Sequence, residues 1–427
     1  MRCWSVSVLC ERLSLDRDPV ALAADLRALV PATGLVSQAV GEIIAEVRAG
    51  GDEAVREYTR RFDTAGAEPG PLLATDSELD AAAARLKPAV RAGLMTAIEN
   101  VQRVAGEALR ADRVVQVGAH QVVLREAPVE SAAVYVPGGR APYPSTVVMG
   151  VVPARVAGVR RIAVCAPPRR GGNLDPVVLG ACRLAGASVV YRMGGAQAIA
   201  ALAYGTRSVG AVDVIVGPGN LYVQEAKRQV FGQVGIDGLA GPSDLVVLAG
   251  GDADPGPLAL DLLAQAEHGP GTLVIGSSPS AEILGALSVS IEAAPDTGAV
   301  ARLVEARDVE GALGLAQALA PEHLQLVGAE IEVLAPRATR AGCVFTGPAA
   351  ATAFGDYIAG SSHILPTGGA ARFASALSPS HFRRSFSEVR IPEASAAELA
   401  RAAAPVARAE GFDLHARSME TRIRDNG

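Results

Sequence analysis

The chain has few aromatic residues and no long apolar run. Hydrophobic residues make up 49 % of its 427 residues but aromatics only 4 %, so much of the apolar content is alanine and valine. Buried strands covered by helices of small residues have this composition, which is typical of layered α/β proteins. The longest apolar run, residues 147–159, is interrupted by Pro153 and Arg155 and falls short of the roughly 20 residues that a bilayer-spanning helix needs. We therefore expect no membrane segment.

Paired cysteines and excess positive charge are also missing. The five cysteines show no C-x-x-C spacing, so the sequence indicates neither a disulfide framework nor a thiolate zinc site. The apolar patch within residues 1–13 is too short, and too soon followed by charge, for a secretory signal. A formal net charge of −6 argues against a nucleic-acid partner, because phosphate binding needs a basic surface. These features predict a cytoplasmic protein that binds a small molecule.

Helical patterns dominate the first hundred residues. Residues 1–30 resemble a short helical lead-in. Apolar positions in residues 35–61 keep a helical period, which Gly50-Gly51 interrupts. Another long helix begins at Asp76 and is broken only by Pro88. We expect these helices to serve as scaffold.

Strands alternate with helices over the middle of the chain. Residues 114–124 predict a hairpin with His120 as a solvated turn residue. Strands that end in glycine or proline then recur before helices, at residues 134–139, 161–168, 189–195 and 212–220. This alternation predicts a parallel sheet with crossover helices, whose ligands bind at the carboxyl ends of the strands.

A second α/β layer is predicted after residue 241. Strands are expected at residues 244–250 and 272–277 and within 301–345, and the chain reads as helical and charged from Ser378. We expect two Rossmann-like parallel-sheet domains, one inserted in the other, with small helical segments at both termini. The expected boundaries are 1–30 for the N-terminal segment, 31–134 with 243–377 for the main domain, 135–242 for the inserted domain and 378–427 for the tail.

Histidine is scarce, with six residues in the whole chain, and several occur in short polar segments. Gln265 and His268 stand three residues apart, so both side chains leave one face of a helix and can hold a metal ion. The alternative is a helix that ends at Gly269-Pro270, where His268 merely sits in a favourable last turn.

Adjacent Glu322 and His323 follow Pro321 in the segment APEHLQL. Two neighbouring groups with different pKa values can divide acid and base duties, the carboxylate taking a proton from water and the imidazole from an alcohol. The alternative is a helix N-terminus, with Pro321 in the first turn and a favourable Glu beside it.

Further histidines and acids lie in a Gly/Ser-rich loop, which carries Asp356 and His363, and in the tail, which carries Glu410 and His415. The tail pair can equally be a solvated helix face. Four of these side chains together offer two imidazole nitrogens and two oxygens, a ligand set that suits zinc or a similar divalent ion and leaves room for substrate. They are Gln265, His268, Asp356 and His415.

No G-x-G-x-x-G fingerprint occurs, but two glycine turns are candidates for a nucleotide site. Gly194-Gly195 precedes a helix with Gln197 in its first turn, where backbone N–H groups attract phosphate. The turn GPGNLY allows close backbone approach and places Asn220 nearby. Ordinary turns and close helix packing are the alternatives.

Nine motifs occur in the order seen in the histidinol dehydrogenase family, which the chain resembles from about residue 35 to its end. They are YVPGGRAPYPS, GGAQAIAALAYGT, VDVIVGPGN, AKRQVFG, AGPSD, DLLAQAEH, APEHL, GDYIAGSSHILPT and EGFDLHA. The resemblance implies oxidation of L-histidinol to L-histidine, the last step of histidine biosynthesis. It also implies two NAD⁺ and one zinc per site, and a homodimer with interleaved domains.

The resemblance assigns roles motif by motif. It implies three NAD contacts, Tyr135, Gln197 and Asn220. It implies four zinc ligands, Gln265, His268, Asp356 and His415, and two proton acceptors, Glu322 and His323. The substrate would be held by Ser243, Gln265, His268, His323, Asp356, His363, Glu410 and His415. Because the family's tail reaches the partner's site, Glu410 and His415 would complete the neighbouring subunit.

Some positions depart from the family pattern. This chain has Asp244 where a Glu is common and Ser362 where an Asn is common, and Thr352 lies in a stretch without the usual Pro-Glu pair. Two other functions stay open on these grounds. One is a zinc- and NAD-dependent dehydrogenase of another small polar alcohol, and the other is a paralogue that binds NAD or an imidazole ligand without turnover.

Overall fold

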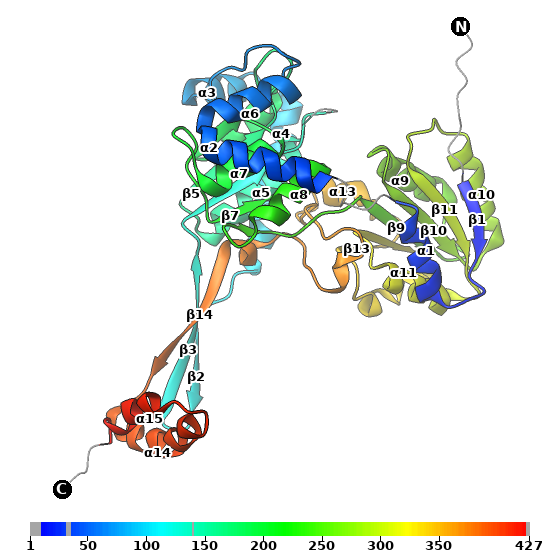
Figure 1. The fold of residues 1–427 in the computed structure, drawn as a ribbon. Helices are drawn as coiled ribbons and strands as arrows, with labels where there is room; N and C mark the ends of the chain where they lie inside the picture. The colour runs from blue at the N-terminus through cyan, green and yellow to red at the C-terminus, as the bar shows by residue number, and fades with distance from the viewer. Residues whose placement is uncertain (1–9, 31–35, 139–140, 424–427) are drawn as a thin grey trace. The chain divides into compact units, whose positions relative to one another are not determined.

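The computed structural model describes residues 10–30, 36–138 and 141–423. The chain forms two compact units, each described here by itself (Figure 1). The main unit comprises the described parts of residues 1–108 and 129–382, and the tail unit comprises those of 109–128 and 383–427. Residues 1–9, part of the expected lead-in, lie outside the described residues.

The first sheet of the main unit is parallel throughout, with the strand order β6-β5-β4-β7-β8. Its strands are β4 (Ser131–Tyr135), β5 (Arg161–Ala166), β6 (Val189–Arg192), β7 (Val214–Val216) and β8 (Gly235–Ile236). The accompanying helices are α2 (Ser37–Phe62), α3 (Asp76–Ala84), α4 (Pro88–Glu107), α5 (Pro144–Ala157), α6 (Pro176–Ala185), α7 (Gly195–Tyr204) and α8 (Leu221–Val230).

Both faces of the first sheet are buried, because alternate residues of each strand enter opposite cores. Ala132 and Val134 of β4 belong to a core formed with α3, α4, α5 and α6. Ala133 and Tyr135 belong to a core formed with α2, α7 and α8. Strands buried on both faces explain the nearly continuous apolar runs in the sequence.

The second sheet is also parallel, with the strand order β1-β11-β10-β9-β12-β13. Its strands are β1 (Cys10–Ser14), β9 (Asp244–Ala249), β10 (Leu273–Ser278), β11 (Val300–Glu305), β12 (His323–Val327) and β13 (Cys343–Thr346). The α-helices that belong with it are α1 (Pro19–Ala28), α9 (Pro255–Ala266), α10 (Ala281–Glu292), α11 (Val309–Leu319), α12 (Ala329–Glu332) and α13 (Thr352–Tyr357). Short 3-10 helices are η2 (Ala335–Arg337), η3 (Ala370–Arg372) and η4 (Pro379–Phe382).

The tail unit combines a three-stranded antiparallel sheet with a helix pair. Its strands, in the order β14-β3-β2, are β2 (Arg113–Val117), β3 (His120–Pro128) and β14 (Arg383–Arg390). The helices α14 (Glu393–Ala409) and α15 (Asp413–Glu420) follow and pack on each other. The predicted hairpin at residues 114–124 is confirmed, with Gly118 at φ 57° in its turn, but His120 is not a solvated turn residue: it is the half-buried first residue of β3 and pairs with Val117.

The expected fold class, two parallel-sheet α/β layers with one inserted in the other, is confirmed. The strands β4–β8 lie in the chain between β1 and β9 of the second sheet. The grouping of helices differs from the expected boundaries, which placed residues 31–134 with 243–377. In the structure, α2, α3 and α4 pack on the first sheet, because their apolar faces meet the two faces of β4.

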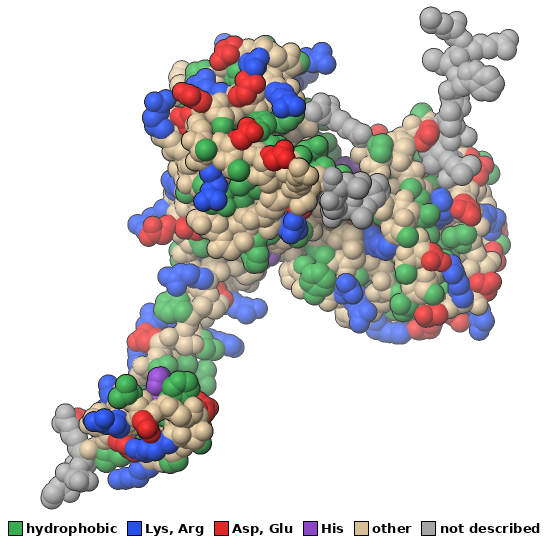
Figure 2. Space-filling model, viewed as in Figure 1, with side chains coloured by type: hydrophobic (Ala, Val, Ile, Leu, Met, Phe, Trp, Pro, Cys, Tyr) green, Lys and Arg blue, Asp and Glu red, His purple; other side chains and the backbone are tan. Residues whose placement is uncertain are grey.

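Two predicted helical segments contain strands. Within residues 1–30, β1 pairs with β11, and after Ser378, β14 pairs with β3. Both pairings join residues more than 250 positions apart, so no local periodicity announces them. None of the helices among the described residues is long and apolar enough to cross a membrane. Acidic and basic side chains are interspersed on the face in view (Figure 2).

Gly150 provides a test of the close packing between α5 and β4. A Cβ atom at Gly150 would overlap the side chain of Val134, whereas one at Gly93 of α4 would meet nothing within 4 Å. We expect Gly150→Ala to destabilise the protein by about 1–3 kcal/mol, because a packed core cannot take the added methyl group. The matched control Gly93→Ala should stabilise it by about 0.5–1 kcal/mol. Thermal melting of both variants checks the prediction, and equal shifts of the same sign would contradict it.

Candidate active site

The candidate acid and base residues gather at the amino ends of two neighbouring strands of the second sheet. Ser243 precedes β9 and Glu322 precedes β12, while Asp244 and His323 are the first residues of those strands. Because β9 and β12 are adjacent and parallel, these side chains meet. The helix alternative for Pro321 is wrong, since the segment runs directly into a strand.

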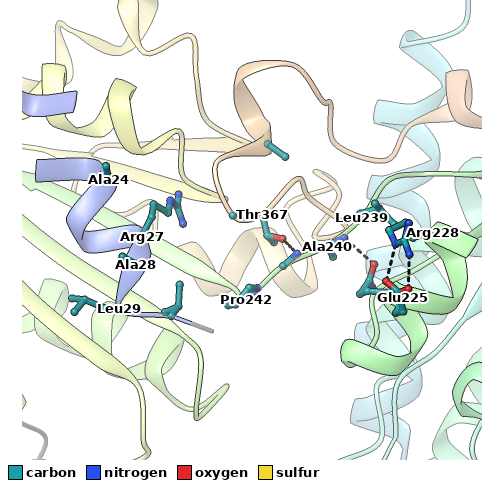
Figure 3. A pocket seen from close by; sticks show the side chains of 15 residues that line it. Ala24, Arg27, Ala28, Leu29, Glu225, Arg228, Leu239, Ala240, Pro242 and Thr367 are labelled. Carbon is teal, nitrogen blue, oxygen red and sulfur yellow. Dashed lines mark hydrogen bonds and ion pairs between the residues drawn. The ribbon is translucent and has the colours of Figure 1, made fainter. Parts of the chain in front are cut away.

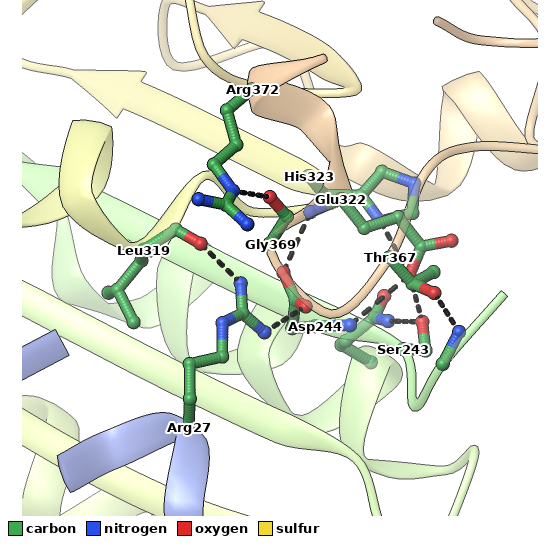
Figure 4. A network of polar contacts seen from close by, with 11 residues as sticks. Arg27, Ser243, Asp244, Leu319, Glu322, His323, Thr367, Gly369 and Arg372 are labelled. Carbon is green, nitrogen blue, oxygen red and sulfur yellow. Dashed lines mark hydrogen bonds and ion pairs between the residues drawn. The ribbon is translucent and has the colours of Figure 1, made fainter. Parts of the chain in front are cut away.

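Glu322 is buried in a network of hydrogen bonds (Figure 4). Its carboxylate accepts from the Ser243 hydroxyl and from the backbone N–H of Asp244, the latter at 3.2 Å. In return, the Asp244 carboxylate accepts from the backbone N–H of Glu322 at 2.7 Å. The Gln265 side chain donates to the Ser243 hydroxyl at 2.5 Å. These bonds connect the proposed base to a predicted metal ligand through a predicted substrate residue.

His323 lies between two carboxylates. Its Nε2 is 3.5 Å from Asp356 Oδ1, and its Nδ1 is 3.9 Å from Glu322 Oε2. Among the described residues, Nδ1 finds no hydrogen-bond partner although the side chain is only 4 % exposed. The ring of Phe345 packs nearby, with centroids 5.8 Å apart. A buried imidazole with one nitrogen beside a carboxylate and the other unpaired is suited to proton transfer.

Burial and charge shift the pKa values of this pair. Burial raises the pKa of the Glu322 carboxyl above its ordinary value, although His323 and the hydrogen bonds oppose the shift. Burial alone would lower the pKa of His323, but the nearby carboxylates of Glu322 and Asp356 outweigh it and raise the pKa. The pKa is thus shifted upward in both residues, so each is a stronger base than its exposed counterpart, and perturbed pKa values of this kind are typical of functional sites.

His363 anchors the loop that follows α13. Its Nδ1 donates to the backbone carbonyl of Asp356 at 2.9 Å, so the neutral ring presents Nε2 as the acceptor for the Thr146 hydroxyl at 3.2 Å. Burial lowers the pKa of His363, which favours this neutral form. The loop histidine and the last turn of α13 therefore hold Asp356 in place.

Three of the four predicted zinc ligands belong to the main unit. Gln265 lies in the last turn of α9, and His268 follows the end of that helix, with its N–H donating to the Gln265 carbonyl at 3.2 Å. Burial alone would raise the pKa of Asp356, but His323, His363 and His268 together hold it below its ordinary value. The Asp356 carboxylate is therefore ionised at neutral pH.

By the chemistry of their donor atoms, these residues suit a divalent metal ion as part of a ligand set. Gln265 uses its amide nitrogen on Ser243, so its amide oxygen is the atom that it can offer to a cation. With the His268 imidazole and the Asp356 carboxylate, this gives the mixed nitrogen and oxygen ligands that zinc accepts. In the part of the chain that the structure describes, no three His, Cys, Asp or Glu side chains group to hold a metal ion. A further ligand is needed to complete a tetrahedral site.

Glu410 and His415, the remaining predicted residues, belong to the tail unit. Glu410 caps the C-terminus of α14, and His415 lies in α15 beside Phe412, with ring centroids 5.2 Å apart. Both are exposed in this unit. Their part in the site stays a prediction.

The three predicted NAD residues lie at the carboxyl ends of the first sheet. Tyr135 ends β4, and its hydroxyl accepts from the Gly195 N–H at 3.1 Å. Gln197, 1 % exposed in the first turn of α7, has an Oε1 without a partner among the described residues. Asn220 caps α8 through its side-chain oxygen, leaving the amide nitrogen as the donor for a ligand. A Cβ at Gly217 would overlap the Tyr135 carbonyl, so glycine permits this close approach.

Asp63 adds a carboxylate to this cluster that the sequence did not predict. The Gln197 side chain donates to it at 3.4 Å. Burial raises the pKa of Asp63 to about 7, although the Gly194 N–H opposes the shift. The residue directly follows α2 in the chain and carries no motif, so only the tertiary structure reveals it. Its acceptor oxygens and Gln197 Oε1 fit a ligand with hydroxyl donors.

The positions that depart from the family pattern have local structural roles. Asp244 is buried, and Arg27 donates to its carboxylate. Thr352 is buried as the first residue of α13, and Ser362 accepts the Ile364 N–H at 3.1 Å. Each of these three residues therefore has a structural reason for its position, either burial or a hydrogen bond.

A cavity of about 840 Å³ lies among α1, α8 and the segments around residues 240 and 368 (Figure 3). Arg27, Arg228 and Thr367 are among its lining residues. None of the predicted site residues lines it, and its lining residues Arg27, Gly241 and Thr367 make hydrogen bonds in the neighbouring polar network. The chemistry of the predicted residues therefore lies outside this cavity.

Comparisons with known proteins agree on one family. A family model described as histidinol dehydrogenase matches residues 31–423. The histidinol dehydrogenase of Cereibacter sphaeroides is 42 % identical over 400 residues, covering 91 % of this chain and 92 % of that protein. That of Parasynechococcus marenigrum is 43 % identical over 404 residues, covering 90 % of each. The crystal structure of histidinol dehydrogenase from Elizabethkingia anophelis superposes with a TM-score of 0.88 at 28 % identity, covering 97 % of this chain and 98 % of that one.

Asp63 makes stability depend on pH. The pKa of Asp63 is about 7 in the folded protein and 3.8 in its ordinary state. Below pH 3.8 the carboxyl is protonated in the folded and the unfolded protein, and its burial costs no ionisation energy. As the pH rises from 3.8 to about 7, the unfolded protein releases this proton more readily, so the free energy of unfolding falls. We expect Asp63→Asn to melt a few degrees above the unmodified protein at pH 8, with the difference shrinking toward pH 5. The control Asp80→Asn, which removes an exposed partner of Arg183, should not raise the melting temperature at pH 8. A pH-independent effect of Asp63→Asn would contradict the prediction.

Proposed function

The chain belongs to the histidinol dehydrogenase family and is an oxidoreductase, and we propose that it converts L-histidinol to L-histidine in two two-electron steps through an enzyme-bound amino aldehyde. The proposed cofactors are two NAD⁺ and one zinc ion per subunit. The observation that carries the proposal is the buried pair of Glu322 and His323, joined to Ser243, Gln265 and Asp356.

Each cofactor has a proposed set of residues. Gln265, His268, Asp356 and His415 would hold zinc, which as a Lewis acid lowers the pKa of a bound alcohol. Tyr135, Gln197 and Asn220 would contact NAD⁺, which supplies the hydride acceptor.

His323 is the proposed proton acceptor for the alcohol. The Asp356 carboxylate beside Nε2 favours a proton on that nitrogen, which leaves the lone pair of Nδ1 to accept one. The same carboxylate stabilises the imidazolium that results. Because the ring is buried, it acts without competition from bulk water.

Glu322 is the proposed base for the second step, in which water adds to the aldehyde before the second oxidation. Its raised pKa makes the carboxylate more basic than an exposed one. Ser243 donates to Glu322 and accepts from Gln265, so it can orient a polar group of the substrate beside both.

We also propose a homodimer in which Glu410 and His415 of one chain complete the site of the other. Both residues belong to the tail unit, whereas the other predicted site residues belong to the main unit, and the family resemblance implies that the tail completes the partner's site. A cytoplasmic location is proposed because the four described cysteines are free thiols.

Activity with L-histidinol tests the proposed function. We expect NADH to form from L-histidinol, to stop on chelation and to recover with added Zn²⁺. His323→Ala should lower kcat by about 10²–10⁴-fold, the usual contribution of a general base, while His120→Ala in the tail hairpin should keep the activity. A panel of other small polar alcohols run alongside identifies a different substrate. Absence of turnover by metal-loaded dimer would overturn the proposal.

Mixed dimers test the shared site. We expect His323→Ala and His415→Ala to be nearly inactive alone. After the two variants are unfolded and refolded together, each mixed dimer has one site with both histidines intact. That site takes His323 from the His415→Ala chain and His415 from the His323→Ala chain. Half of randomly formed dimers are mixed, so activity should recover to about a quarter of the unmodified level. If each chain completed its own site, no mixture would regain activity.

A further inference from the structure

We propose that Arg27 of α1 is a positioning residue for Glu322 and acts through Asp244. The inference rests on the proposed function, because it assigns a role in the step that Glu322 performs. Arg27 lies outside every motif that indicated the function, and it is 295 positions from Glu322 in the sequence (322 minus 27). Figure 4 shows the three side chains in one network.

Arg27 is held at two points. One guanidinium nitrogen donates to Asp244 Oδ2, and the other donates to the Leu319 backbone carbonyl at 2.6 Å. The Arg27 side chain is 19 % exposed and the Asp244 side chain 2 % exposed, so the ion pair is largely removed from water. Two-point attachment fixes the plane of the guanidinium and, with it, the orientation of the carboxylate.

Asp244 transmits this orientation to Glu322. Its second oxygen, Oδ1, accepts the Glu322 backbone N–H at 2.7 Å. Its own backbone N–H donates to the Glu322 carboxylate at 3.2 Å. Rotation of the Asp244 carboxylate would therefore break the bond to Arg27 and the bond to Glu322 together. Both the backbone and the carboxylate of the proposed base depend on where Asp244 lies.

Arg27 also balances charge beside the base. Asp244 and Glu322 are both buried and each carboxylate accepts the other residue's backbone N–H, so the two negative charges would repel each other. The positive charge of the Arg27 guanidinium neutralises the negative charge of Asp244. Ionised Glu322 is therefore repelled less strongly by its neighbour. Removing one partner of a buried ion pair leaves the other charge unpaired, which displaces nearby groups.

The test compares the two oxidation steps in the metal-loaded, full-length protein. Arg27→Gln is assayed with NAD⁺ and either L-histidinol or the amino aldehyde, and a carbonyl-trapping reagent reports released aldehyde. Because Glu322 serves the second step, we expect kcat for aldehyde oxidation to fall about ten- to 100-fold, as for a misplaced catalytic group. Formation of the aldehyde should change far less, so the aldehyde accumulates. Arg27→Lys should recover part of the lost rate, because it keeps the charge but not the two-point attachment.

A matched control is Arg17→Gln. Arg17 precedes α1 and pairs with Asp25 of that helix, and both side chains are well exposed. It should leave both steps unchanged. If Arg27→Gln fails to fold, Asp244→Asn gives the second test and should show the same selective loss. Equal loss of both steps in a folded variant, or no loss, would overturn the positioning role. Failure of the unmodified protein to oxidise L-histidinol would instead overturn the proposed function.

Discussion

A carboxylate buried where two parallel strands begin is the constraint on which the candidate site depends. Glu322 can lie there only because Asp244, the first residue of β9, and Glu322, which directly precedes β12, exchange hydrogen bonds, each backbone N–H donating to the other residue's carboxylate. A buried carboxylate without such donors would be strongly destabilising. The pairing of β9 with β12 is thus both a sheet contact and the support of the proposed base.

The two sheets present their candidate site residues at opposite strand ends. In the first sheet, Tyr135 ends a strand and Gln197 and Asn220 follow turns after strands, as expected for ligands of parallel α/β sheets. In the second sheet, Glu322 and His323 stand where a strand begins. Side chains from α9 and α13 complete this second site. Its position therefore follows from helices and loops that converge on the strand starts, and not from the general rule for sheet ligands.

Sequence predicted the parts of the fold whose signals are local. Each strand from β4 to β7 carries its own apolar run and closing glycine or proline, so the parallel alternation could be predicted. The strands β1 and β14 were missed, because their partners lie far away in sequence. In the site, residue types in recurring motifs identified His323 and Asp356. Arg27 and Asp63 could not be predicted, since only tertiary burial distinguishes them from other charged residues.

Glu322 and Asp63 are both buried carboxyl groups that are held by a backbone N–H donor, one beside each of the two parallel sheets. Burial raises the pKa of each carboxyl, and in each case a backbone N–H opposes the shift, from Asp244 for Glu322 and from Gly194 for Asp63. A backbone donor is lost only by substitution with proline, and its position is fixed by the strand or helix that carries it. The backbone donor keeps the carboxyl group oriented. Its ionised form is nevertheless less favourable in the protein than in water, because burial raises its pKa. The fold thus gives up stability at both carboxyls, which is the usual balance between stability and activity at functional sites.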